Sequence, residues 1–263
     1  MKVSIIMGAY NTASTLPSSI DSVINQTYKD WELIICDDCS KDNTYDVAKS
    51  YADKYENIVV IRNEKNSRLA YSLNHCLQYA KGEYVARMDA DDLCLPDRLE
   101  KQVKFLDEHP EYQVVGGGVL LFDGEKVKKT LLNPEVPEKE YLAKGVPFFH
   151  PTIMMRKSAY DALDGYLVSE RTKRGQDYDM WFRFFANGFK GYNLQEPVLR
   201  YHDSIEDYGK KSSWEMTWSA TKTMWIGFNM VRMPLRLYPW VLKPIISYLL
   251  PRKIVYMIHN KKA

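Results

Sequence analysis

Short apolar runs alternate with segments of helical spacing through the first 110 residues. Each run is four to six residues long and uninterrupted, as expected of strands buried on both faces. The segments between the runs place apolar side chains three and four residues apart, as helices do. Such alternation predicts right-handed β-α-β units and a parallel sheet. The predicted strands are residues 3–7, 31–36, 58–61 and 84–88, and the predicted helices are residues 12–26, 45–55, 67–80 and 96–108.

The alternation loosens after residue 110. Apolar runs at 112–121 and 126–132 flank Asp123-Gly124, a pattern typical of a β-hairpin. The sequence then predicts one α/β domain over residues 1–209, in which 1–110 form the parallel sheet and 111–209 add mixed strands. The later predicted elements are a strand at 151–155, a short helix to Leu163, a helix at 177–187, and strands at 191–194 and 198–202.

Residues 210–263 form a tail of different composition. The net charge of the chain is only +2, but the tail holds ten lysines and arginines against one acid, Glu215. A helix is predicted at 211–230, with Trp214, Trp218 and Trp225 on one face. Basic residues, tryptophans and short apolar pieces are typical of an element on an anionic membrane surface. Packing on its own domain, or in a homodimer, is the alternative. The apolar pieces are residues 235–240, 245–250 and 254–258.

The sequence also predicts where the protein works. No apolar run approaches the ~20 residues that span a bilayer, and residues 2–7 are too short for the apolar part of a signal peptide. Cys36 and Cys39 form a C-x-x-C, but the two aspartates between them disfavour the thiolate that redox or metal chemistry needs. We therefore predict a cytoplasmic protein, peripherally associated with the inner face of the cell membrane. Nucleic-acid binding is not expected, because the basic charge is confined to an apolar tail.

Three carboxylates, Asp89, Asp91 and Asp92, follow the fourth predicted strand within four positions. Such like charges repel one another unless a cation lies among them. Mg²⁺ binds one or two carboxylates and completes its shell with substrate phosphates. Ligands of open α/β sheets bind outside the carboxyl ends of the strands, so a divalent cation site is predicted here. A solvated acidic turn before the next helix is the alternative.

This stretch is one of several motifs that resemble those of a known family. Taken in this order, each at a strand end or helix start, they resemble family 2 of the glycosyltransferases, of the bacterial surface-polysaccharide type. That resemblance covers residues 2–202 and implies the GT-A fold, with inverting transfer from nucleotide-diphosphate sugars. The motifs are Val3-Ser4-Ile5-Ile6-Met7-Gly8-Ala9-Tyr10-Asn11, Asp37-Asp38-Cys39-Ser40-Lys41-Asp42-Asn43-Thr44, Ala80-Lys81-Gly82-Glu83-Tyr84, Arg87-Met88-Asp89-Ala90-Asp91-Asp92, His150-Pro151-Thr152 and Gln176-Asp177-Tyr178-Asp179-Met180-Trp181.

The resemblance implies a site for the donor nucleotide-sugar. Asp38 is similar to the family's base-reading acid, and acceptance of a uracil N–H would favour a UDP-sugar; helix capping is the alternative for Asp37 or Asp38. Cys39 and Arg68 stand where relatives usually have glycine, so a turn that needs positive φ would be strained at Cys39. The implied donor-binding residues are Ala9, Tyr10, Asn11, Asp38, Arg68 and Asp89.

The resemblance also implies the metal ligands and the catalytic base. Asp91 would hold Mg²⁺ or Mn²⁺, Asp89 would hold the ribose or share the metal, and His202 could complete the shell. Asp177 would be the general base that takes the proton of the acceptor hydroxyl; its alternative is a helix acid favoured by the macrodipole. A lone histidine is more often structural, which is the alternative for His150 and His202.

These residues favour a metal-dependent inverting glycosyltransferase of the hexosyltransferase class. It would move a sugar from a UDP-sugar to a hydroxyl of a growing, lipid-linked surface glycan. A sugar-1-phosphate nucleotidyltransferase is one alternative, but residues 8–11 lack the glycine-rich basic loop it needs. A non-catalytic, membrane-docked module that binds nucleotide-sugar is the other. A dehydrogenase is disfavoured because no G-x-G-x-x-G follows the first strand.

Overall fold

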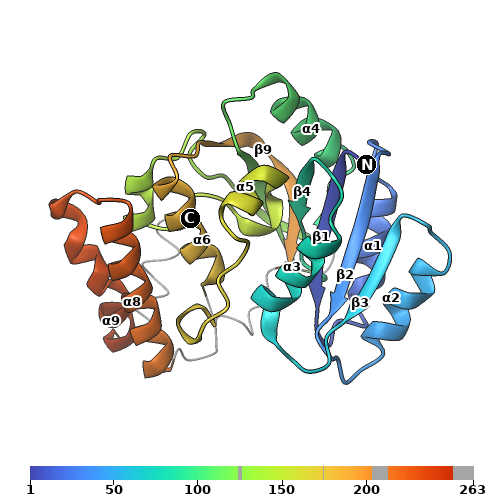
Figure 1. Ribbon diagram of the computed structural model, residues 1–263, viewed down its shortest axis with the longest axis horizontal. Coiled ribbons are helices and arrows are strands. Elements are labelled where there is room, and N and C mark those ends of the chain that lie inside the picture. The colour runs from blue at the N-terminus through green and yellow to red at the C-terminus, as the bar shows by residue number, and fades with distance from the viewer. Residues whose placement is uncertain (124–125, 174, 203–212, 251–263) are drawn as a thin grey trace. The chain divides into compact units, whose positions relative to one another are not determined.

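The computed structural model describes residues 1–123, 126–173, 175–202 and 213–250 (Figure 1). The chain divides into two compact units. The predicted boundary between residues 209 and 210 lies outside the described residues and stays a prediction. The first unit comprises Met1–Pro137, Phe148–Tyr166 and Phe189–Asp203, and the second comprises Glu138–Pro147, Leu167–Gly188 and Ser204–Ala263.

A mixed sheet forms the first unit. Over the described residues its strand order is β3-β2-β1-β4-β8-β6-β9-β5, with β7 paired to β6. Figure 1 shows its parallel strands side by side. β2 and β4 are buried along their whole length, which explains why they read as continuous apolar runs. The parallel strands are β1 (Val3–Ala9), β2 (Trp31–Asp37), β3 (Ile58–Arg62) and β4 (Tyr84–Arg87).

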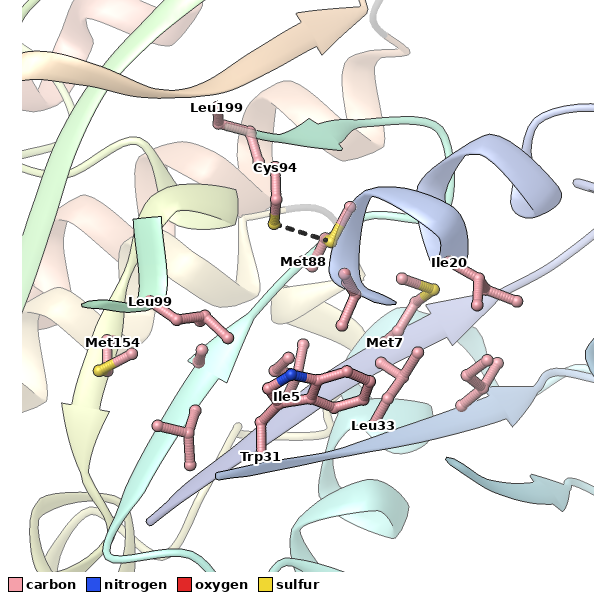
Figure 2. Close-up of a cluster of buried hydrophobic side chains, with 14 of the residues drawn as sticks. Ile5, Met7, Ile20, Trp31, Leu33, Met88, Cys94, Leu99, Met154 and Leu199 are labelled. Carbon is pink, nitrogen blue, oxygen red and sulfur yellow. Dashed lines mark hydrogen bonds between the residues drawn. The ribbon is translucent and has the colours of Figure 1, made fainter. Parts of the chain in front are cut away.

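Helices cover both faces of this parallel half. α3 packs on β1 and β2, while α1 contributes Leu16, Ile20 and Val23 to the core on the opposite face. Figure 2 shows Ile5, Met7, Ile20 and Leu33 in this core, which extends to Met88 and Cys94. Full burial of each aliphatic side chain stabilises the fold by about 1.5–3 kcal/mol. The helices are α1 (Leu16–Ile24), α2 (Thr44–Ala52), α3 (Arg68–Tyr79) and α4 (Arg98–Glu108).

A buried hydrogen-bonded link fixes β1, β2 and β4 at their amino ends. The Ser4 hydroxyl donates to Glu32 Oε1 (2.6 Å), which also accepts the Lys81 N–H (2.8 Å). The Gly82 N–H donates to Ser4 Oγ (2.8 Å). A Cβ at Gly82 would lie 2.5 Å from the Ser4 backbone nitrogen, so only glycine allows this approach. The Lys81-Gly82 motif therefore sets where β4 begins.

The second half of the sheet is mixed, as predicted. β8 is antiparallel to both β4 and β6, and β6 is parallel to β9. β6 and β7 form the expected antiparallel pair. The α/β class with a mixed-strand extension is therefore confirmed. The elements are β5 (Leu93–Cys94), β6 (Val114–Asp123), β7 (Lys126–Leu131), the 3-10 helix η2 (His150–Thr152), β8 (Met154–Arg156), α5 (Lys157–Ala162) and β9 (Gly191–His202).

Several predicted boundaries in this half were wrong. The strands predicted at 191–194 and 198–202 are one strand, β9, whose register shifts opposite Gly117 and Gly118, where Pro197 is accommodated. The strand predicted at 151–155 begins only at Met154, because η2 precedes it. The helix predicted from Pro96 begins at Arg98. β5 was not predicted, since two residues carry no periodicity.

Packed helices make up the described part of the second unit. The Phe182 and Phe228 rings lie 5.9 Å apart where α6 meets α8, and a Cβ at Gly227 would lie 2.2 Å from Phe182. None of the described helices is long and apolar enough to cross a membrane. The predicted piece at 254–258 lies outside the described residues. The elements are the 3-10 helices η1 (Lys139–Ala143), η3 (Glu170–Thr172) and η4 (Leu235–Leu242), and the α-helices α6 (Gln176–Ala186), α8 (Trp214–Met230) and α9 (Lys243–Leu249).

Candidate functional site

The carboxyl ends of β1, β2 and β4 are neighbours in the sheet. Ala9 at the end of β1 pairs with Asp37 at the end of β2, and Ile6 of β1 pairs with Arg87 at the end of β4. The loops that follow these strands carry most of the residues predicted to bind the donor. Because these loops leave the same edge, ligands of such sheets bind beside them.

The loops after β1 and β2 are tied together by hydrogen bonds. The N–H groups of Asn11, Thr12 and Ala13 donate to Ser40 Oγ (3.0 Å), Thr44 Oγ1 (2.8 Å) and Asp42 Oδ2 (3.1 Å). In return, Asn11 Oδ1 accepts the N–H of Lys41 (2.9 Å). These three N–H groups therefore fix the second loop against the first. Among the predicted donor contacts here, Ala9 is buried and the Tyr10 side chain is 40% exposed.

Asp37 and Asp38 are both buried and have different partners. Asp37 Oδ2 lies 3.0 Å from Nε of Arg62, and its carboxylate accepts the N–H of Ser40. Asp38 accepts the first N–H groups of α3: Ser67 N–H donates to Oδ1 (2.8 Å) and Arg68 N–H donates to Oδ2 (2.7 Å). Asp38 therefore caps the start of α3; helix capping was the alternative to a donor contact for this residue.

An unpredicted polar network lies behind Asp38. Asn63 Nδ2 donates to Asp38 Oδ1 (2.7 Å) and to Ser72 Oγ (3.0 Å), and Asn63 Oδ1 lies 2.8 Å from His75 Nδ1. No sequence pattern connected Asn63 or His75 with Asp38. Neither residue lies in a motif, so only the packing of α3 against the sheet brings them together.

Three residues of this region have left-handed backbones, the first of them Asn11 with φ +54°. Cys39 has φ +58° and Arg68 has φ +73°. The expectation that Cys39 would be strained if its turn needed positive φ is therefore met, at a cost of about 1–2 kcal/mol for a non-glycine residue. Arg68 stands at the first position of α3, and its side chain is exposed.

The three acids after β4 lie together. One oxygen from each of Asp89, Asp91 and Asp92 lies within 4.8 Å of the others. Asp91 is exposed, Asp89 is partly buried and Asp92 is buried. α1 holds this loop, since Thr15 Oγ1 donates to the carbonyl of Ala90 (3.0 Å) and Ser19 Oγ donates to that of Asp92 (2.8 Å). The predicted cluster is thus a set of hard oxygen ligands in a fixed loop.

Arg87 is the cation that faces this cluster. Its side chain is 4% exposed, and its guanidinium makes a bidentate contact with the Asp89 carboxylate. Nη1 lies 2.7 Å from Oδ2, and Nη2 lies 2.5 Å from Oδ1. Burial lowers the pKa of Arg87, but the charges of Asp89, Tyr166 and Asp92 and the hydrogen bond to Asp89 together outweigh it, so the net shift is upward.

Tyr201 and His202 are the last two residues of β9. Partial burial, together with the negative charges of Asp89 and Asp92, raises the pKa of Tyr201 to about 12. No sequence signal pointed to Tyr201. His202, predicted as a metal ligand, is the last residue of β9, but its side chain lies outside the described residues.

His150 is buried in the first unit and bonded to tyrosine. Its Nε2 lies 2.8 Å from the Tyr166 hydroxyl, which lies 3.2 Å from that of Tyr160. Burial and the positive charge of Arg87 hold the pKa of His150 well below its ordinary value. These contacts favour the structural interpretation of His150.

Asp177 lies in the second unit, in the first turn of α6. Its Oδ1 accepts the N–H of Tyr178 (2.8 Å), and its carboxylate is partly exposed. Asp179 is buried and held by two arginines: Arg171 Nη1 at 2.6 Å and Arg183 Nε at 2.9 Å. The two helix acids therefore differ: Asp179 forms buried ion pairs that stabilise the fold, whereas the Asp177 carboxylate is accessible.

The fold and the acid cluster define an α/β enzyme of GT-A architecture. The chain belongs to glycosyl transferase family 2, whose model matches residues 4–164. It is 47% identical to EpsE of Bacillus subtilis (strain 168), provisionally described as a glycosyltransferase, over 100% of this chain and 94% of that protein. These matches identify the chain as a glycosyltransferase.

A more distant relative and a solved structure extend the comparison. The chain is 40% identical to the Escherichia coli enzyme WfgD, UDP-Glc:alpha-D-GlcNAc-diphosphoundecaprenol beta-1,3-glucosyltransferase, over 40% of each chain. The crystal structure of S. aureus TarS 1–349 in complex with UDP-GlcNAc has a TM-score of 0.70 at 19% identity, covering 95% of this chain and 72% of that one. The latter likeness establishes the fold.

We expect His150 to make stability pH-dependent. The folded protein keeps His150 neutral, whereas the unfolded chain takes up a proton below its ordinary pKa of about 6.5. The stability contribution is therefore full above pH 6.5 and is lost as the pH falls below it. His150→Gln should remove about 1 kcal/mol of the loss between pH 7.5 and 5.5. Urea unfolding at both pH values measures this, with the partly exposed His109→Gln as control. Equal pH slopes for wild type and His150→Gln would contradict it.

Proposed function

We propose that the protein is a metal-dependent inverting glycosyltransferase that moves a sugar from a UDP-sugar to a hydroxyl of a lipid-linked surface glycan. The observation that carries this proposal is the convergence of Asp89, Asp91 and Asp92 at the carboxyl end of β4. Membership of glycosyl transferase family 2 supports the transfer of a sugar.

The acid cluster suits a divalent cation. Its ligand atoms are carboxylate oxygens, which Mg²⁺ and Mn²⁺ prefer over nitrogen or sulfur. Asp91 and Asp89 would hold the cation, with His202 as a further ligand. Asp92 is buried, and its backbone closes the turn by donating to the carbonyl of Asp89 (3.4 Å). When bound, the cation would neutralise charge on the departing diphosphate.

The donor is proposed to be a UDP-sugar. Asp38 Oδ1 accepts two hydrogen bonds and Oδ2 accepts that of Arg68, so a second lone pair of Oδ2 is the position for a uracil N–H. The exposed ring of Tyr10 follows Ala9 and can cover the base. Arg68 would reach the phosphates, and Asn11 holds the loop that carries these groups. The UDP-Glc named for WfgD and the UDP-GlcNAc bound to TarS favour this choice.

Asp177 is proposed as the general base. Its carboxylate would take the proton of the acceptor hydroxyl as that oxygen attacks the anomeric carbon and UDP departs. A single displacement with the base opposite the leaving group inverts the anomeric centre. The N–H of Tyr178, which bonds to Oδ1, fixes the orientation of the carboxylate. Asp179 is unsuited to this role because two arginines hold it as a buried anion.

The acceptor and the membrane are proposed from the C-terminal helices. Trp214, Trp218 and Trp225 of α8 are each more than half exposed. The described part of this region carries Lys222, Arg232 and Arg236 at exposed positions. Tryptophan and basic side chains together favour an anionic lipid surface on the inner face of the cell membrane. The lipid-linked acceptor in the name of WfgD agrees with this proposal. Further exposed apolar residues are Leu235, Leu242, Ile246 and Leu249.

Asp91→Ala tests the metal site. Wild-type protein should bind UDP about tenfold or more tightly with Mn²⁺ than without it, because the cation links the acids to the diphosphate. The variant should lose this dependence, while Asp53→Ala, at the exposed acid that follows α2, should keep it. Titration calorimetry measures both affinities. Equal UDP affinity of the wild type with and without Mn²⁺ would refute the metal site.

Asp177→Asn tests the base. Removal of a general base typically slows transfer by about 10²–10⁴-fold, and UDP binding with Mn²⁺ should stay within about twofold. Release of UDP from a panel of UDP-sugars, with an acceptor glycan present, measures the rate. Glu170→Gln, an exposed acid of the same unit, is the matched control. Full activity of Asp177→Asn would reject Asp177 as the base.

Surface substitutions test the membrane proposal better than truncation, because loss of α8 would uncover Phe182 of α6. Trp218→Ser with Trp225→Ser should weaken sedimentation with phosphatidylglycerol vesicles by about tenfold or more, through lost apolar burial. Tyr55→Ser, at an exposed aromatic position of the first unit, is the control. The homodimer would be favoured instead if wild-type protein does not sediment with the vesicles and elutes as a dimer in size-exclusion chromatography. The double variant would then elute as a monomer.

A further inference from the structure

We propose that Arg87 is the built-in counter-cation of the acid cluster. It holds Asp89 in one orientation, and it lowers the charge of the cluster so that a bare divalent cation binds weakly until the donor diphosphate arrives. This inference rests on the proposed metal site and adds a role for a residue that need not touch donor, acceptor or metal. Arg87 is thus a positioning residue.

The geometry of Arg87 leaves it little freedom. The Arg87 backbone is held on both sides of β4. Arg87 pairs with Ile6 of β1 on one side, and on the other its N–H donates to the carbonyl of Ile153 (3.0 Å). The Arg87 carbonyl accepts from Arg98 Nη2 (2.8 Å). Because the strand fixes the Cα and burial fixes the side chain, the guanidinium stays beside Asp89.

The two-point contact with Asp89 sets the carboxylate plane. Nη1 and Nη2 each bond to a different oxygen of Asp89, at 2.7 and 2.5 Å. A planar fork of this kind fixes both the position and the rotation of a carboxylate, which a lysine ammonium cannot do. Each Asp89 oxygen keeps a further lone pair for a ribose hydroxyl or a metal.

Charge gives the second part of the role. Three carboxylates bring three negative charges to one loop, and Arg87, which stays protonated at any ordinary pH, returns one positive charge. Arg98 also lies near and bonds to the Arg87 carbonyl, while His150 is neutral because burial and Arg87 hold its pKa low. Arg87 is a buried, lasting positive charge that contacts the cluster directly through Asp89.

A fixed cation beside a metal site weakens binding of a bare metal ion through direct repulsion. The diphosphate supplies further negative charge and oxygen ligands, so full affinity is reached only in its presence. The cluster would consequently not retain a tightly bound ion once UDP has left. This behaviour follows from the placement of Arg87 and is separate from the catalytic chemistry.

Binding of Mn²⁺ without nucleotide tests the inference, with free Mn²⁺ quantified by electron paramagnetic resonance. Arg87→Met should bind Mn²⁺ at least about tenfold more tightly than wild type, because the repelling charge is gone. Arg87→Lys keeps the charge, so its Mn²⁺ affinity should stay within about twofold of that of wild type. Its KM for the UDP-sugar should rise, because Asp89 is no longer held at two points. A misfolded site would weaken Mn²⁺ binding in both variants.

Two controls assign the effect to the cluster. The gain in Arg87→Met should vanish when Asp91→Ala is added, and Lys101→Met, which removes one charge from α4, should leave Mn²⁺ affinity unchanged. Arg87→Gln, which retains a donor to Asp89, replaces the methionine variant if the latter does not fold. Mn²⁺ affinity that is unchanged or weaker in folded Arg87→Met or Arg87→Gln overturns the inference. If wild-type protein shows no Mn²⁺ binding that Asp91→Ala removes, the proposed metal site itself fails.

Discussion

The hydrogen-bonded register of β1 between β2 and β4 is the constraint on which the first unit depends. The buried link from Glu32 through Ser4 to Gly82 fixes the three strands at their amino ends. Because paired strands have a set rise per residue, fixing one end also fixes where each strand stops. The loop of acids after β4 and the loop with Asp38 after β2 therefore leave the sheet at determined positions on either side of β1.

The parallel half of the fold was predictable because its determinants are local. Strands buried on both faces produce uninterrupted apolar runs, and Gly82 marks the beginning of β4. The mixed half was harder to predict. β9 contains Pro197, which reads as a break, yet a shift in register against Gly118 lets one strand continue through it. Such compensation depends on the partner strand, and sequence pattern along one strand does not contain it.

The site, too, has residues that were predictable from the sequence and residues that were not. Asp89, Asp91 and Asp92 were predictable as a cluster because they follow one strand within four positions. Asn63, His75 and Tyr201 come from other elements and reach the site through packing alone. Asp38 shows a further limit. Its identity suggested a contact with the donor, but its backbone partners at the start of α3 appear only when the fold brings that helix alongside.

The hydrogen bonds between the first two loops have a consequence for how this enzyme can change. Ser40, Thr44 and Asp42 hold the backbone that carries Tyr10, so the two loops form one hydrogen-bonded unit. A substitution in either loop disturbs both at once. New donor preferences are then expected to arise through paired, compensating replacements across the two loops, and diversification by insertion is expected to occur elsewhere in the chain.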